Sequence, residues 1–251
     1  MRRITWLALT IVFFTLCSTS LLPQQTESHA PDAFQGFRFG IINITIRTIP
    51  DAPFTANVRA ELIRTLADGN TMVRKNHRLV ARDSSGRVFE ERRYITADDD
   101  VHQSSLFQTD LRDPIAHEMY VCDGTGQLCH LYFFAPPPSV PEVPFPGVTG
   151  QVTRVNIGTA MISGVETIGT REITIIPAKD AGTSHPVTLS KEFWYSPQLG
   201  INIRVTRIDP RAGTENFLVD DLNVGEPDTQ LFEVPTGANI IRETTPAPWW
   251  P

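Results

Sequence analysis

Cysteine is scarce in this sequence. The 251 residues include three cysteines, with Cys17 near the N-terminus and Cys122 and Cys129 in the stretch "YVCDGTGQLCHLYFF". Six residues separate the later pair, whereas catalytic redox pairs usually have the spacing C-x-x-C. On a strand, His130 projects to the face opposite Cys129, away from the thiol. The spacing therefore argues against both a redox centre and a thiolate metal centre.

The motifs of common enzyme classes are also lacking. "HEMYV" (117–121) begins like the H-E-x-x-H helix of zinc proteases, but Val121 stands where the second histidine must be. No G-x-S-x-G elbow, P-loop or dinucleotide fingerprint occurs. The acidic run "DDD" (98–100) lacks the ligand spacing of a calcium loop, so we interpret it as a solvated loop. We expect no catalytic residues, no metal site and no cofactor.

Basic residues are fewer than acidic residues in this sequence. The net charge is −6, and removing residues 1–30 takes away Arg2, Arg3 and Glu27 and makes it −7. Because phosphate-backbone binding needs a basic surface, we expect no nucleic-acid partner.

After residue 30, no run approaches the ~20 apolar residues of a membrane span. The locally basic run 74–93 is either a patch for an acidic partner or a wet strand face, and we favour the latter.

The first thirty residues have the features of a secretory signal peptide. Arg2 and Arg3 precede the apolar stretch Ile4 to Leu16, and small polar residues follow. Cleavage fits after Ser18, Ser20 or Ala30. We therefore expect an exported protein, either periplasmic or extracellular. Lipid anchoring at Cys17 is a further alternative, but Leu16 stands where a lipoprotein signal needs a small residue.

Alternation with a period of two residues dominates the rest of the chain. In "PFTANVRAEL" (53–62), residues 54, 56, 58, 60 and 62 are apolar or small and share one face, and polar residues share the other. The turns "ADGN" (67–70) and "DSSG" (83–86) join consecutive strands as an antiparallel meander. Strands are predicted over residues 53–62, 71–82, 87–95, 115–122, 128–134, 158–164, 166–177, 187–196, 201–209 and 215–224.

These patterns predict a mainly β protein with a curved antiparallel sheet, a half-barrel or open barrel, and few short helices. Short helical pieces are expected near 105–113 or 226–232. We expect one β-rich domain over 31–245 with a proline-rich connector at 135–147. An aromatic tail, 246–251, ends the chain with Trp249 and Trp250, which either tuck against the body or form an exposed anchor.

Several of these segments resemble a group of secreted proteins of uncharacterised function from acidobacteria and relatives. The resemblance is carried by "PFTANV", "LADGN", "RDSSGRVFEER" and the "VCD…LC" hairpin, and later by "GTAMISGVETIGTREITIIPA", "KEFWYSPQLGINI" and "DPRAGTENFLVDDLNVGEPDTQLFEVP". It covers nearly all of residues 51–241. The matching positions are turn and core residues, so the resemblance implies a fold and no catalytic role.

The early pattern more distantly resembles periplasmic lipoprotein carriers and envelope-stress sensor domains (LolA/RseB-like). Their half-barrel implies a concave apolar face that holds an acyl chain or an apolar peptide. Little helix is expected here to cover that face, so no ligand-binding residue is transferred from the family. The residues of this chain that would line such a face are Phe54, Val58, Leu62, Phe193, Tyr195, Ile201 and Ile203. The same residues would equally form the core of a closed barrel.

The resulting hypothesis is an exported envelope binding module that carries or senses a lipid or another apolar ligand, or binds an envelope protein partner. The alternatives are a structural or interaction protein without a small ligand, and an envelope enzyme that sequence motifs do not reveal.

The two later cysteines are predicted to form a disulfide. Counting outwards from the four-residue loop "GTGQ", Cys122 lies opposite Cys129 on the two strands of a hairpin. An exported location supplies the oxidising conditions that a disulfide needs.

Mass analysis of the natively exported protein should therefore find no free thiol at either position. Because the loop is short, replacing both cysteines by serine should lower the free energy of unfolding by only about 2 kcal/mol, as chemical denaturation would measure. Two free thiols in the exported protein would contradict the prediction.

Overall fold

The computed structural model describes residues 44–97, 99, 103–133 and 151–245. The predicted signal peptide with Cys17, the proline-rich connector 135–147 and the tail with Trp249 and Trp250 lie outside these residues.

The described residues form one continuous sheet. Its strands are β1 (Phe54–Thr65), β2 (Thr71–Arg82), β3 (Val88–Arg93), β4 (Leu106–Asp113), β5 (Glu118–Asp123), β6 (Leu128–Phe133), β7 (Gln151–Ile162), β8 (Val165–Ile176), β9 (Val187–Ser196), β10 (Ile201–Asp209), β11 (Gly213–Val224) and β12 (Asn239–Arg242). A helical turn, α2 (Ala178–Ala181), and a 3₁₀ helix, η1 (Thr229–Phe232), complete the described elements.

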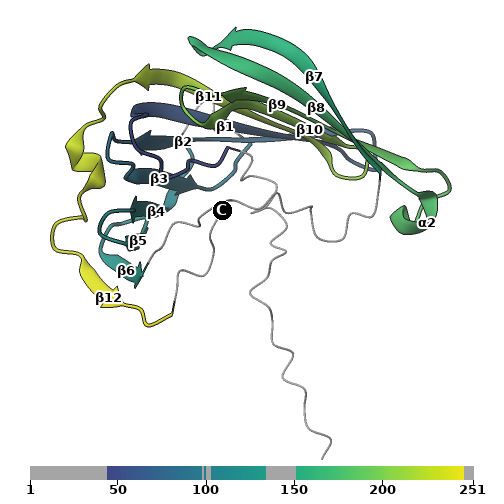
Figure 1. Ribbon diagram of the computed structural model, residues 1–251. Helices are drawn as coiled ribbons and strands as arrows, with labels where there is room; N and C mark the ends of the chain where they lie inside the picture. The colour runs from purple at the N-terminus through teal and green to yellow at the C-terminus, as the bar shows by residue number, and fades with distance from the viewer. Residues whose placement is uncertain (1–43, 98, 100–102, 134–150, 246–251) are drawn as a thin grey trace, which may run out of the picture.

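The strands follow the order β12-β6-β5-β4-β3-β2-β1-β11-β10-β9-β8-β7. All neighbours are antiparallel except β12, which runs parallel to β6. Figure 1 shows that the sheet curls strongly but does not close, with β12 at one edge and β7 at the other. The predicted fold class, a curved open antiparallel sheet with almost no helix, is confirmed.

Three sequence expectations differ from the structure. The segment 105–113, a candidate for helix, is instead β4, because it pairs along its length with β3 and β5. Strand β7 begins at Gln151, several residues before the predicted start at 158. Strand β12 was not predicted, since four exposed residues give no alternation of buried and exposed positions. The helical turn expected near 226–232 is present as η1.

The turn between β1 and β2 sets the register of the sheet's centre. Asp68 accepts a hydrogen bond from the backbone N–H of Asn70 (3.0 Å), and Gly69 has the positive φ (84°) that the tight turn requires. From this turn, the pairing runs regularly from Thr65 opposite Thr71 to Phe54 opposite Arg82.

The predicted disulfide is confirmed. Cys122 and Cys129 lie opposite each other on β5 and β6, are bonded, and have Cα atoms 4.0 Å apart. His130 is paired with Val121 and bonds through Nδ1 to a carboxylate oxygen of Glu243 (2.6 Å). This hairpin is therefore a covalent staple near one edge of the sheet.

The inner side of the sheet carries the core. Residues 44–49, which we call the strap, form no regular secondary structure and precede β1; in Figure 1 this stretch (purple) runs on the inner side of the curved sheet. Ile44 and Ile46 of the strap are fully buried in one cluster with inward residues of β1, β10 and β11. The cluster also contains Phe54, Ala56, Val58, Ala60, Ile201, Ile203, Val205, Phe217 and Val219.

Arg82, at the end of β2, joins three parts of the molecule. Its guanidinium is fully buried and donates to the carbonyls of Ala52 (2.7 and 2.9 Å), Arg47 (3.0 Å) and Leu199. Its charged group also lies over the ring of Phe54, 5.0 Å from the centroid. Burial lowers the pKa of Arg82 from its usual high value to about 10, so the group stays protonated at neutral pH. One cation thus connects the strap, β2 and the β9–β10 turn.

Replacing Arg82 by methionine should lower the free energy of unfolding by about 3–5 kcal/mol, because three buried carbonyls lose their donor. Urea unfolding at neutral pH measures this. As a control, Arg171→Met removes an exposed arginine that pairs with Glu192 (3.0 Å) and should cost no more than about 1 kcal/mol. Equal effects of the two changes would show that Arg82 is not a structural centre.

Candidate functional site on the concave face

The concave face is built from matching rows of inward side chains on neighbouring strands. Ala60 on β1 lies opposite Phe217 on β11, and Phe217 lies opposite Val205 on β10. Val205 in turn lies opposite Phe193 on β9. Since directly opposed residues share a face, these side chains form one apolar row across four strands.

The predicted ligand-contacting residues occupy different depths of this face. Four of them, Phe54, Val58, Ile201 and Ile203, are at most 1% exposed and belong to the buried cluster with the strap. Phe193 packs against the cluster and is half-buried, as is Leu62. Tyr195 is 39% exposed. The first four therefore act as core under the strap, and the accessible part of the face lies around Phe193 and Tyr195.

Strand β8 extends the accessible part of this face. Ile168 lies opposite Tyr195 and is 38% exposed, so the two side chains are neighbours on the inner side of the sheet. Lys191 places its ammonium over the ring of Phe193, 5.5 Å from the centroid. An apolar surface with a cation beside it is thus available next to the covered core.

The strap is held on the concave face through its backbone as well as its side chains. Arg78 donates to the carbonyl of Ile44 (3.3 Å), and Arg82 donates to that of Arg47 (3.0 Å). Ile44 and Ile46 fill the apolar surface between these bonds. The face therefore holds both the apolar side chains and the carbonyl groups of this segment.

A cluster of buried charges lies beside the apolar surface, on β2, β3 and β4. Glu90 accepts hydrogen bonds from Arg78 (3.0 Å) and from Arg112, and Arg92 bonds to Asp110 (2.9 Å). Arg78, Glu90, Asp110 and Arg112 are all less than 5% exposed. The Nε of Arg112 is buried without a hydrogen-bond partner among the described residues.

This cluster shifts the pKa of its acid strongly. Burial alone would raise the pKa of Glu90, but the three arginines around it outweigh burial and lower the pKa from 4.5 to about 2. Burial also lowers the pKa of Arg78, although Glu90 opposes the effect. The carboxylate is consequently ionised throughout the physiological pH range.

The structure corrects the preferred interpretation of the basic run 74–93. We expected a wet strand face, but Arg78 and Arg82 are buried on the same side as Val58 and Phe54, their partners across the β1–β2 pairing. The sequence of β2 conceals this because both of its faces mix charged and apolar residues. Counting the register from the "ADGN" turn would have placed Arg78 beside Val58.

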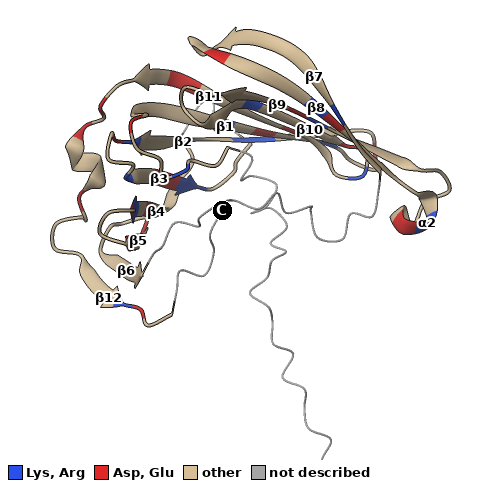
Figure 2. Ribbon diagram, viewed as in Figure 1, with Lys and Arg blue, Asp and Glu red and all other residues tan. Residues whose placement is uncertain are grey.

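A second row of charges crosses the concave face at the other end of the apolar surface. Figure 2 shows acidic and basic residues interspersed along the strands rather than gathered into blocks of one sign. Within this row, Arg154 bonds to Glu172 (2.7 Å), and Arg207 lies 3.6 Å from Glu215. Lys191 lies between these pairs, and burial lowers its pKa. The apolar surface is therefore bounded by charge on two sides.

Within the described residues, no helix is long and apolar enough to cross a bilayer. The same part of the chain contains no group of three or more His, Cys, Asp or Glu residues placed to hold a metal ion.

Comparison with known proteins gives matches to solved structures alone. No family model and no curated protein matches the chain, so the resemblance to secreted acidobacterial proteins stays a prediction. The complex of MucA and MucB from Pseudomonas aeruginosa matches at 12% identity over 80% of this chain and 62% of that chain, with a TM-score of 0.39. This chain thus spans less than two thirds of the matched MucB length.

Two further matches cover most of the matched structure. A LolA superfamily protein, NE2245 from Nitrosomonas europaea, is 12% identical over 75% of this chain and 92% of that chain, with a TM-score of 0.27. The Mycobacterium tuberculosis lipoprotein LppX is 13% identical over 75% and 90%, with a TM-score of 0.26. At these scores the matches assign neither a family nor a ligand to this chain.

The low pKa of Glu90 predicts an acid-sensitive stability. Because its pKa is lower in the folded chain than the ordinary 4.5, Glu90 stabilises the fold above about pH 4.5, and this is lost as the pH falls towards 2. The contribution is about 3 kcal/mol. Urea unfolding between pH 5 and pH 2 should therefore show a steep loss of stability that is reduced in Glu90→Gln.

Glu166 is exposed, so Glu166→Gln serves as the control: it makes the same chemical exchange at the surface, where no buried carboxylate is lost. A pH dependence that is identical in wild type and Glu90→Gln would contradict the assignment.

Proposed function

We propose that this chain is an exported binding module that holds a lipid acyl chain, or another extended apolar ligand, on the concave face of its sheet. The observation that carries the proposal is the strap. A short segment with two fully buried isoleucines already lies on this face, and inward arginines bind its carbonyls. An acyl chain linked through an ester or amide offers the same two features, a long apolar body and a carbonyl acceptor.

The charges beside the apolar surface support an amphipathic ligand. The cluster around Glu90 and the row containing Lys191 lie on either side of it, so a ligand's polar end would meet hydrogen-bonding groups where its apolar body ends. Polar groups placed at the margin of an apolar site commonly fix the orientation of a ligand.

Export is part of the same proposal. The leader over residues 1–30 and the disulfide between Cys122 and Cys129 both fit a protein that works beyond the cytoplasmic membrane, in the periplasm or outside the cell.

A second candidate function is binding of an envelope protein by strand addition. β7 is an edge strand of twelve residues, all exposed except Ile157, Ala160 and Ile162. It carries apolar Val152 and Val155 and a single charged residue, Arg154. A long edge with unpaired backbone groups is a template for a strand from a partner.

Native mass spectrometry of the protein purified after export tests the first function. We expect a co-purified lipid in wild type and its loss in Tyr195→Glu, which places a charge on the accessible part of the concave face. Binding of a fluorescent fatty acid should weaken by about tenfold or more in this variant. Tyr94→Glu changes a tyrosine that is 59% exposed and contacts Phe107 instead, and it should bind as wild type does.

Wild type that carries no lipid and binds the fatty acid no better than Tyr195→Glu would exclude the lipid function. Capture of a single envelope protein under the same conditions, lost when proline replaces Val155, would favour strand addition at β7.

A further inference from the structure

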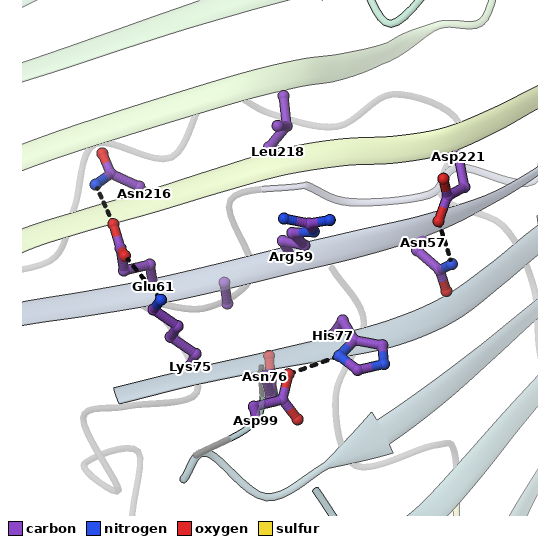
Figure 3. A pocket seen from close by; sticks show the side chains of 11 residues that line it. Asn57, Arg59, Glu61, Lys75, Asn76, His77, Asp99, Asn216, Leu218 and Asp221 are labelled. Carbon is purple, nitrogen blue, oxygen red and sulfur yellow. Dashed lines mark hydrogen bonds and ion pairs between the residues drawn. The ribbon is translucent and has the colours of Figure 1, made fainter. Parts of the chain in front are cut away.

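A polar cavity lies on the outer face of β1, β2 and β11, opposite the concave face. Its volume is roughly 590 Å³, within the range of about 300–1,000 Å³ typical of small-molecule sites. Because side chains alternate along a strand, Asn57, Arg59 and Glu61 point outwards here while Val58 and Ala60 point into the core. Figure 3 shows these outward side chains surrounded by groups from β2, β11 and Asp99.

The cavity contains a histidine held in a fixed orientation. His77 Nδ1 lies 2.6 Å from a carboxylate oxygen of Asp99, which is 5% exposed and also accepts the backbone N–H of Ser104 (2.8 Å). Burial would raise the pKa of Asp99, but the bonds from Ser104 and His77 lower it below 3.8, so the carboxylate is ionised at neutral pH.

An ionised carboxylate only accepts hydrogen bonds, so Nδ1 of His77 must carry the proton in this pair. In the neutral imidazole, Nε2 is then an acceptor, and Figure 3 shows it pointing away from Asp99. No described residue donates to it. The cavity thus presents a pre-oriented acceptor.

Both cations of the cavity lie beside a carboxylate. Arg59 bonds to Asp220 (2.8 Å), and Lys75 lies 3.7 Å from Glu61. Glu61 also accepts a bond from Asn216 (3.1 Å). Among the described lining residues, Leu218 is the one large apolar side chain. Asp221, a third acid of the lining beside Glu61 and Asp99, accepts a hydrogen bond from Asn57 (3.1 Å). Donors and acceptors therefore both line the cavity, and its acids outnumber its cations.

We propose that this cavity binds an uncharged, polyhydroxylated ligand, namely a mono- or disaccharide unit of a glycan. Each hydroxyl group donates one hydrogen bond and accepts others, which matches a lining of donors and acceptors such as Arg59, Glu61 and His77. An anionic ligand would meet more acids than cations here, and both cations already lie beside a carboxylate. The site is independent of the proposed function on the concave face.

Titration calorimetry with the full exported chain tests the proposal, with cellobiose, maltose and N,N′-diacetylchitobiose as neutral probes. At least one should bind saturably, and Glu61→Gln and His77→Phe should each weaken it by about tenfold or more. Glu61→Gln exchanges a carboxylate acceptor for an amide donor, and His77→Phe removes both ring nitrogens. Glu192→Gln is the matched control, because Glu192 lies outside the cavity and pairs with Arg171. Thermal melts confirm that all variants fold.

Glycylglycine and inorganic phosphate are the competing probes, zwitterionic and anionic respectively. Saturable binding of either in place of the sugars would overturn the proposed ligand class. Absence of saturable sugar binding, or sugar binding that Glu61→Gln and His77→Phe leave unchanged, would overturn the site itself.

Discussion

The fold depends on a buried cation that has carbonyls as its hydrogen-bond partners. Arg82 donates to the backbone of Arg47, Ala52 and Leu199, which come from the segment before β1 and from the β9–β10 turn. A guanidinium can serve several acceptors at once because its donors diverge in one plane. The strap is held on the same face by Arg78 and by the buried Ile44 and Ile46. Arg82 therefore contributes both to the stability of the sheet and to the covering of its concave face.

Strands β1 and β2 contribute side chains to both faces of the sheet, the concave core and the outer polar cavity. Their inward residues form the core and the arginine contacts, and their outward residues form the polar cavity around His77. A change of register by one residue would exchange the two surfaces completely. The regular pairing from Thr65–Thr71 to Phe54–Arg82 is thus a requirement for both proposed binding sites.

Much of the architecture could be predicted from the sequence, because local alternation and turn residues determine it. The bounds of β2, β9 and β10 follow from alternation between clear turns, and the Cys122–Cys129 bond follows from the hairpin register. The inward arginines and the His77–Asp99 pair could not be found in this way. Their partners lie on other segments, and the strand that carries them has polar residues on both faces. β4 and β12 were missed because their pairing partners, not their own patterns, make them strands.

The two edges of the sheet differ in a way that limits assembly. β7 presents twelve residues, with an irregularity between Asn156 and Gly158, whereas β12 presents four. A very short edge strand offers too few backbone groups for stable pairing with another chain. Among the described strands, β7 is therefore the edge suited to pairing with another chain, and two molecules joined through their β7 edges would form a closed pair.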